Sequence, residues 1–456
     1  MTIRQPNRRR ALVLPAIALS LGACGGSDSV PPAEPIAYVE AAGVIDPAFG
    51  TGGLAKISPT QGFSVSEIAE LGDGSLLVGG TNPFIAKLTA QGQLDAAFAV
   101  NGIDTTRRGT KYFQTVKNIT PLSTGRIAIV EEHKSPCAAT PFTCISLTFG
   151  DLVARRIDAS GKDDPGYGDA GLGSLPYSQG AIVVAPSGRV VSFTLRPSGA
   201  TTAFGVASLD PSGQRDIGFE ARAQAALQCG GRFDPQLTRV ASVGASMAGD
   251  RFNVATAWQG TSTLPQSFCV SRLNADGTID PGFADQGHRT FAPVASVAQN
   301  VFGVRVRSSG EIVVVLSPRP RTSNLSPPVL LLLTASGARD TSIDASGVQS
   351  MPIILVASLF DLVLQPNGKI VYVGQSSLSP GIPTLPLDEE DPKAGRSSST
   401  AGIYDGGFGP FRGGYAILRT ADGALRPNKV AIDRRGGILV GGDLVSTNQP
   451  AVLRLQ

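Results

Sequence analysis

The sequence predicts an all-β fold, a β-propeller of about seven four-stranded blades. Three observations support this prediction: 55 Gly and 33 Pro among 456 residues, a strand–turn–strand element that recurs, and a short phrase that recurs between its copies. One such unit cannot bury its own apolar faces, so consecutive units must stack on one another. A large two-sheet sandwich or a β-helix with coincidental turns is the alternative.

The strand–turn–strand element is the more regular of the two repeats. Its clearest copy spans residues 362–374, where two aliphatic runs flank Asn367-Gly368. This dipeptide favours positive φ and predicts a tight two-residue hairpin turn. The copies centre on Gly74, Gly125, Gly188, Gly249, Gly310, Gly368 and Gly436.

The second repeat is the phrase Asp46-Pro47-Ala48-Phe49-Gly50. Weaker copies begin at Asp95, Asp164, Asp216, Asp280 and Asp340. We expect each unit to run as a strand after the phrase, the glycine hairpin, and a further strand. An extra strand-like segment at residues 36–40 is expected to close the ring by pairing with the C-terminal blade, in which residues 451–455 form the last strand, and this would remove exposed sheet edges.

Residues 46–53, 272–283 and 365–374 together resemble the delta-60 repeat family of bacterial proteins. The resemblance extends over nearly all of residues 36–456. It implies a propeller-like fold and frequent export signals, and it brings no catalytic residues to this chain.

The N-terminus predicts a lipoprotein signal peptide at residues 1–23. Arg8, Arg9 and Arg10 precede an apolar run, residues 11–21, that is too short to span a bilayer. Leu21-Gly22-Ala23-Cys24 looks like a lipobox, with Cys24 as the lipid attachment site. The alternative is an ordinary secretory leader with a chance cysteine.

The rest of the chain is then a flexible tether at residues 24–35 and a propeller domain at residues 36–456. Gly25 follows Cys24, and by resemblance to lipoprotein sorting this favours the outer membrane, facing the periplasm or the exterior. No later segment predicts a membrane span; the apolar run at residues 353–364 is interrupted by Ser358 and Asp361.

Composition argues against several classes of function. The net charge of +3, with no basic block in the body of the chain, gives no nucleic-acid footprint. The two histidines disfavour a His-built catalytic metal site. His133 is expected in a solvated loop and His288 at the start of a strand. We predict no catalytic residues, metal or cofactor.

Acidic residues in the repeat do not match the pattern of a calcium-binding loop. Asn274, Asp276 and Asp280 lack the spacing of an EF-type loop, because Arg272 and Phe283 occupy ligand positions. Hydrogen bonds to their own turns are the expected role of these side chains.

Four cysteines besides Cys24 fit an oxidising compartment. Cys137 and Cys144 are close in sequence and would staple one loop, which leaves Cys229 with Cys269. All three connectivities stay open on sequence alone.

Long insertions fall mainly between the second hairpin strand and the strand that follows, at residues 131–150, 259–267, 317–328 and 375–413. Strand alternation places these loops on one face, which predicts a binding surface. The largest carries partner-binding candidates for an envelope protein or glycan: Asp388, Glu389, Glu390, Asp391, Tyr404, Phe408 and Phe411. The alternative is a solvated insertion.

The sequence therefore predicts an exported, lipid-anchored binding or assembly module of the bacterial envelope. Its partners would be the membrane, through Cys24, and an envelope protein or glycan. The alternatives are an enzyme acting on an envelope polysaccharide or other polymer, which carboxylates clustered at the central pore would favour, and a structural spacer.

Overall fold

The computed structural model describes residues 38–39, 41–57, 63–106, 113–134, 150–176, 180–198, 201–229, 239–259, 266–292, 299–318, 328–342, 346–350, 358–375, 392–397, 408 and 415–456. They belong to one compact unit, Tyr38–Gln456. The predicted signal peptide, Cys24 and the predicted tether lie outside the described residues. Among the helical residues described, none forms a helix long and apolar enough to cross a membrane.

The described residues form seven antiparallel sheets, five of them four-stranded. From the inner strand outward, the first three are β2 (Val65–Glu70), β3 (Leu76–Gly80), β4 (Phe84–Leu88) and β5 (Ile103–Asp104); β6 (Phe113–Pro121), β7 (Ile127–Lys134), β8 (Asp151–Ile157) and β9 (Leu172–Leu175); β10 (Gly180–Val184), β11 (Val190–Ser198) and β12 (Thr201–Leu209).

The next three sheets are β13 (Arg239–Ala248), β14 (Arg251–Gln259), β15 (Ser267–Leu273) and β16 (His288–Phe291); β17 (Gln299–Val306), β18 (Ile312–Pro318), β19 (Val329–Leu333) and β20 (Val348–Ser350); β21 (Ser358–Leu364), β22 (Ile370–Gln375), β23 (Pro392–Ser397) and β24 (Tyr415–Ile417). The last sheet holds β25 (Arg419–Thr420), β26 (Gly423–Ile432), β27 (Ile438–Leu444), β28 (Pro450–Leu455) and β1 (Leu54–Lys56).

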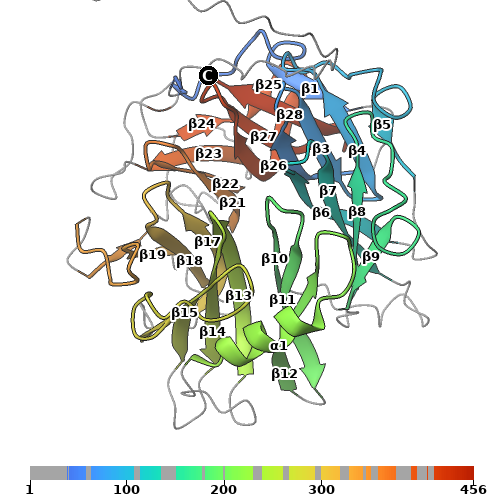
Figure 1. Cartoon of the computed structure of the whole chain (residues 1–456). Helices are drawn as coiled ribbons and strands as arrows, with labels where there is room; N and C mark the ends of the chain where they lie inside the picture. Colours follow the sequence, from blue (N-terminus) through green and yellow to red (C-terminus); the bar gives the residue numbers. More distant parts are fainter. Residues whose placement is uncertain are drawn as a thin grey trace, which may run out of the picture. The chain divides into compact units, whose positions relative to one another are not determined.

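The inner strands contact one another in a closed cycle. In order, β2 contacts β6, β6 contacts β10, β10 contacts β13, β13 contacts β17, β17 contacts β21, β21 contacts β26, and β26 contacts β2. Figure 1 shows these strands gathered at the centre with the other strands of each sheet outside them. The unit is a β-propeller, as the repeats predict.

Apolar side chains fill the spaces between sheets on both faces of a strand. In β19, Val329, Leu331 and Leu333 belong to the core shared with β15, whereas Leu330 and Leu332 belong to the core shared with β22. Alternation of side chains along a strand produces this division. It explains why β19 is a continuous apolar run with all five residues buried.

The glycines that centre the seven hairpins all have positive φ, between 59° and 96°. The prediction of a two-residue turn at Asn367-Gly368 is wrong. Gly368 N–H donates to the Gln365 carbonyl at 2.9 Å, and Asn367 is not among the positive-φ residues. This is the longer hairpin loop in which one left-handed glycine ends the turn.

The strand after the recurring phrase belongs to the preceding sheet, and not to its own repeat as expected. β5, which follows the copy at Asp95, pairs with β4, and β9, which follows the copy at Asp164, pairs with β8. Each hairpin therefore supplies the two inner strands of a sheet, and the phrase leads into its outermost strand.

Ring closure follows the same rule and corrects the prediction for residues 36–40. β1 follows the first phrase and pairs with β28, with Leu54 opposite Leu453 and Ala55 opposite Val452. Of the predicted segment, Tyr38 and Val39 are described and lie in no strand. Leu54 and Ala55 close the ring because their apolar side chains are buried at this seam.

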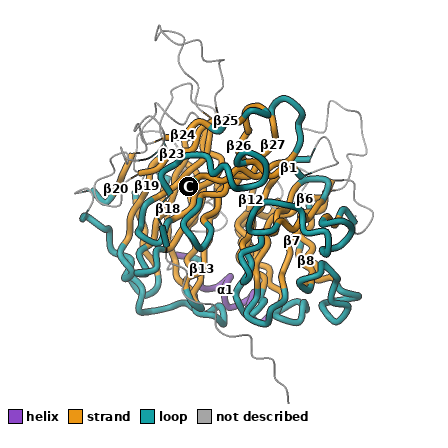
Figure 2. The backbone as a smooth tube through the Cα atoms, turned by 90° about the horizontal axis from the view of Figure 1, so that it is seen from above, coloured by secondary structure: helices purple, strands orange, loops and turns teal. Residues whose placement is uncertain are grey.

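One helix in the described residues, α1 (Ile217–Ala226), departs from the all-β pattern. It replaces the outer strand of the β10–β11–β12 sheet and is drawn in purple in Figure 2. Asp216 caps its N-terminus by accepting the Phe219 N–H at 2.8 Å, and Glu220 lies in its first turn. The weaker copy of the phrase at Asp216 thus starts a helix, for which a capping carboxylate and the alanines that follow are favourable.

Residues of the recurring phrase form contacts that connect neighbouring sheets. Asp280 accepts the Gly282 N–H at 3.0 Å and the Arg272 guanidinium at 2.8 Å, and Arg272 lies 4.6 Å from the Phe283 ring centroid. The Phe283 ring packs on Gly337 of the next sheet, where an added Cβ would lie 2.7 Å from it. The aromatic rings of four other copies pack against a glycine in the same way: Phe49 on Gly92, Phe98 on Gly161, Tyr167 on Gly213 and Phe219 on Gly277.

These contacts confirm the expected turn role of Asp276 and Asp280. Asp276 accepts the Thr278 N–H at 2.9 Å and the Thr278 hydroxyl at 2.7 Å. The second repeat therefore encodes both a turn and the contact that stacks one unit on the next.

Candidate functional site

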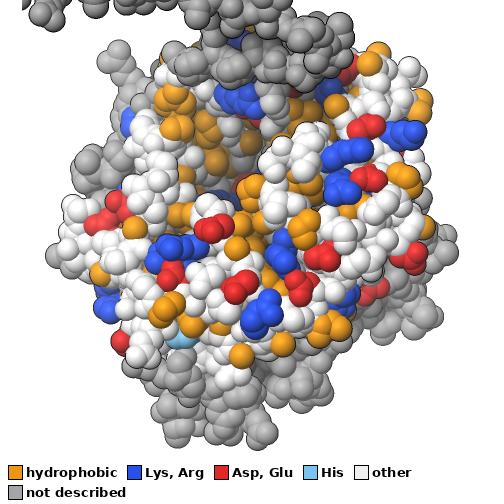
Figure 3. All heavy atoms as spheres, in the orientation of Figure 1, with side chains coloured by type: hydrophobic (Ala, Val, Ile, Leu, Met, Phe, Trp, Pro, Cys, Tyr) orange, Lys and Arg blue, Asp and Glu red, His pale blue; other side chains and the backbone are white. Residues whose placement is uncertain are grey.

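The candidate site is a cavity of about 600 Å³ lined by residues from all seven inner strands. Figure 3 shows a hollow on this face of the molecule, between the sheets whose inner strands Figure 1 places at the centre. Its ionisable lining residues are Glu67, Glu70, Lys117, Arg305, Asp361 and Lys429. Most come from one half of the ring, whereas β10 and β13 contribute apolar and small polar residues.

Four of these charges form a chain of ion pairs across the seam where the ring closes. Lys429 Nζ lies 3.0 Å from Glu67 Oε1 and 3.5 Å from Asp361 Oδ2. Arg305 Nη2 lies 3.1 Å from Asp361 Oδ1. The chain thus joins β2, β26, β21 and β17 with alternating charge, and we call it the cavity quartet.

Backbone groups hold the quartet in place. Arg305 Nε donates to the Leu362 carbonyl at 3.0 Å, and Val430 N–H donates to Asp361 Oδ2 at 3.1 Å. Each contact crosses from one sheet to the next, so the quartet contributes to the packing of the ring as well as to the character of the cavity.

Two members of the quartet have shifted pKa values. Desolvation raises the pKa of Glu67 above its usual 4.5, although Lys429 opposes the shift. Burial alone would lower the pKa of Lys429, but the carboxylates of Glu67 and Asp361 outweigh it and hold that pKa above 10.5. Lys429 is therefore a permanent cation at neutral pH.

A repeated β-bulge determines which side chains reach the cavity. Among the described residues, six of the seven inner strands shift register against the neighbouring strand of their own sheet. The residues that follow these bulges are Glu67, Asn118, Ser242, Gly303, Asp361 and Lys429. Bulges redirect side chains and often lie next to functional sites, and four of these six residues line the cavity.

None of the described residues of the predicted binding loop, residues 375–413, lines this cavity. Asp388, Glu389, Glu390, Asp391, Tyr404 and Phe411 lie outside them. Phe408 is fully buried in a core cluster with Leu418, Leu425 and Leu54. Its expected role as an exposed anchor is wrong, because its apolar ring fills the core between the last two sheets.

Both histidines are placed by the structure. His133 is 4% exposed within β7, and its Nε2 lies 3.0 Å from Glu131 Oε2, so the predicted solvated loop is wrong. Residues 131–134 are strand residues because all four pair with β6 and the first three also pair with β8. His288 begins β16, as predicted, and burial lowers its pKa below 6.5.

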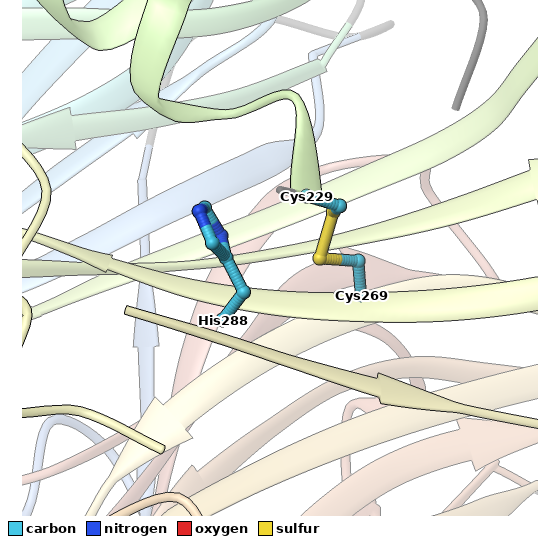
Figure 4. Close-up of side chains that lie close together, drawn as sticks. All are labelled: Cys229, Cys269 and His288. Carbon is cyan, nitrogen blue, oxygen red and sulfur yellow. A yellow bond between two sulfur atoms is a disulfide. The ribbon is translucent and has the colours of Figure 1, made fainter. Parts of the chain in front are cut away.

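Cys229 and Cys269 form a disulfide, and Cys137 and Cys144 lie outside the described residues. Figure 4 shows the disulfide beside the His288 ring. One ligand atom from each of Cys229, Cys269 and His288 lies within 4.8 Å of the other two. We call these residues the Cys–His cluster.

Comparisons with known proteins support the fold. A family model described as a domain of unknown function (DUF5122) β-propeller matches residues 260–283, which include β15 and the phrase at Asp280. No curated protein matches the chain.

Several solved structures are similar to the chain in part. A polysaccharide lyase of family PL25, an ulvan lyase, is 10% identical over 91% of this chain and 96% of its own, with a TM-score of 0.47. A protein of unknown function from Dyadobacter fermentans is 10% identical over 75% of this chain and 96% of its own, with a TM-score of 0.42. Drosophila semaphorin 1b, extracellular domains 1–2, is 8% identical over 91% of this chain and 87% of its own, with a TM-score of 0.39.

Proposed function

We propose that this chain is an exported, lipid-anchored β-propeller that acts as a binding module of the bacterial envelope, with the central cavity as its ligand site. The observation that carries the proposal is the cavity itself, which combines charged groups from five sheets with apolar and small polar residues from β10 and β13. Cavities of this size with a few convergent polar groups are the usual form of small-ligand sites. The lipobox at Cys24 and the resemblance to the delta-60 repeat family support the export part of the proposal.

Binding is favoured over catalysis by the contacts of the cavity carboxylates. Glu67 faces Lys429, Asp361 faces both Lys429 and Arg305, and Glu70 accepts the Arg434 N–H at 2.7 Å. A general acid must release its proton to the substrate and a general base must accept one. Glu67 and Asp361 are engaged in ion pairs with Lys429 and Arg305, which a substrate would have to displace before either carboxyl group could exchange a proton with it.

The enzyme alternative is supported by the carboxyl groups that line the cavity, Glu67, Glu70 and Asp361, since the sequence analysis expects such a cluster at the central pore of an enzyme. The raised pKa of Glu67 places a carboxyl that protonates more readily beside Asp361, a carboxylate held by two cations. Two carboxyls in unlike environments are the arrangement of a polysaccharide-cleaving site. Release of new chain ends from an envelope polysaccharide, abolished by Glu67→Gln, would establish this alternative.

Replacing Cys24 by serine is expected to abolish the lipid anchor. In bacteria fed a radiolabelled fatty acid, the unsubstituted full chain should carry label and sediment with membranes, because several acyl chains on one cysteine give a stable anchor. The Cys24→Ser chain should carry none and remain in the soluble fraction. Label retained by the serine variant, or a wild-type chain that stays in the cytoplasm, would overturn the proposed export.

The cavity is tested with soluble oligosaccharides and peptide fragments prepared from envelope polymers, titrated calorimetrically into the full chain in detergent. Lys117→Ala and Asp361→Asn should weaken binding by about tenfold or more, because each removes a charged hydrogen-bonding group from the lining. Lys56→Ala is the matched control. Its side chain is 38% exposed, as against 39% for Lys117, and it pairs with Asp422 outside the cavity lining.

Three other results have distinct meanings. Binding that survives both cavity variants but is lost on deletion of residues 375–413 would transfer the ligand site to the insertion loops. Binding lost equally in Lys56→Ala would indicate a nonspecific charge effect. A chain that binds no fragment in the panel would support the structural spacer.

A further inference from the structure

The Cys–His cluster is assembled by strand register. Ser271 lies opposite His288 in the β15–β16 pair, and Cys269 lies two residues before Ser271. Residues two apart in a strand share a face, so the Cys269 sulfur, the Ser271 hydroxyl and the His288 imidazole are brought to one side of the sheet. The Ser271 hydroxyl lies 2.9 Å from His288 Nδ1 and 3.6 Å from Cys269 Sγ.

Cys229 reaches the cluster from the neighbouring sheet. It follows α1, which replaces the outer strand of the β10–β11–β12 sheet, and it has a left-handed backbone with φ of 51°. Its side chain packs with Trp258 and Cys269 in a small buried cluster. The two cysteines are thus held together by the fold around them as well as by the bond between their sulfurs, with Cα atoms 6.4 Å apart.

We propose that in the dithiol state Cys229, Cys269 and His288 form a binding site for Zn²⁺, and that the disulfide closes this site. Two thiolates and an imidazole are the ligand types that zinc prefers, and three protein ligands leave a fourth position for water or the Ser271 hydroxyl. The mutual distances of up to 4.8 Å between the ligand atoms allow all three to approach one ion after small side-chain rotations.

The two states interconvert with balanced chemistry. A small dithiol reductant attacks one sulfur of the Cys229–Cys269 bond, which forms a mixed disulfide and releases the other cysteine. The second thiol of the reductant then attacks the mixed disulfide and displaces the remaining cysteine, so that the reductant leaves as a cyclic disulfide after supplying two electrons and two protons. Both protein thiols then lose their protons to solvent as they bind Zn²⁺. Reoxidation by a disulfide acceptor takes two electrons from the thiolates, reduces the acceptor to two thiols with two solvent protons, and releases the ion.

The site would therefore be open in a newly exported chain before its disulfide forms, and closed in the mature protein. The central cavity plays no part in this proposal. Its lining residues include none of the Cys–His cluster, so the two proposals can fail separately.

The test uses the full chain carrying Cys137→Ser and Cys144→Ser. Because the sulfur of Cys24 carries the lipid, Cys229 and Cys269 then supply the free thiols after reduction. The protein is reduced with a phosphine in denaturant, refolded without oxygen, and titrated with Co²⁺ as a spectroscopic substitute for Zn²⁺. We expect one equivalent of Co²⁺ to give thiolate-to-cobalt absorption that Zn²⁺ abolishes, and the oxidised protein to give none.

Two histidine variants distinguish a metal site that includes His288 from metal binding by the two cysteine thiols alone. His288→Gln should weaken Co²⁺ binding by about tenfold or more, whereas His133→Gln, the same change at the other histidine of the chain, should leave it unchanged. In the unsubstituted protein, bound Zn²⁺ should protect His288 from carbethoxylation, measured by peptide mass spectrometry, which covers the case in which His288→Gln does not fold. Equal affinity in the two variants, an unprotected His288, or a reduced chain that does not regain its β circular dichroism would overturn the proposal.

Discussion

Replacing Arg155 by leucine is expected to lower the free energy of unfolding by about 3–5 kcal/mol. Arg155 is 2% exposed, and its guanidinium lies 3.0 Å from Glu131, 3.0 Å from Asp104 and 2.8 Å from Asp163. Glu131 and Asp104 are themselves buried. Leucine fills part of the volume of Arg155 but removes the cation that compensates the desolvation of these carboxylates. We expect this loss of compensation to account for most of the decrease in unfolding free energy.

Arg156→Leu is the matched control, one residue along the same strand. Arg156 pairs with Asp164 at 2.8 Å and stacks on the Tyr167 ring, but it is more exposed to solvent. We expect this change to cost about 1 kcal/mol or less, measured by denaturant unfolding of both variants. Adding Glu131→Gln and Asp104→Asn to Arg155→Leu should recover part of the loss. Equal costs for the two arginines would show that Arg155 acts through packing alone.

The fold could be predicted because its signals are local and repeated. A left-handed glycine between two aliphatic runs specifies a hairpin wherever it occurs, and Gly74 and Gly368 both turn hairpins in the structure. The partner of the strand after the phrase could not be predicted in this way. Whether β5 joins the sheet before or after it depends on how whole units stack, and no short-range pattern records that choice.

The cavity was not predicted, because its charged residues are distant in the sequence. Lys429 and Glu67 are 362 residues apart and meet only when the ring closes. One signal was present: Asp361 interrupts an apolar run, and a carboxylate at such a position must find a partner inside the fold. Arg305 and Lys429 stand in similar strand contexts, but pairing them with Asp361 requires the order of the sheets in the ring.

Replacing Leu54 by aspartate is expected to lower the free energy of unfolding by about 4 kcal/mol or more, from lost apolar burial and an unpaired buried carboxylate. Leu54 is 1% exposed and lies opposite Leu453 in the pairing of β1 with β28 that closes the ring. The closing strand has only three residues, so one charge disturbs most of its apolar contact.

Val39→Asp is the matching change in residues 36–40, the segment that the sequence predicts to close the ring. Val39 is 68% exposed, and its N–H donates to the Arg435 carbonyl at 3.0 Å, a contact that a side-chain change leaves intact. This variant should unfold within about 0.5 kcal/mol of the parent chain, as surface substitutions usually do. Thermal and denaturant unfolding of both variants decide between the two closures. A large loss of unfolding free energy in Val39→Asp with a small loss in Leu54→Asp would assign ring closure to residues 36–40. We expect the opposite result, because β1 must pair with β28 before the ring can form.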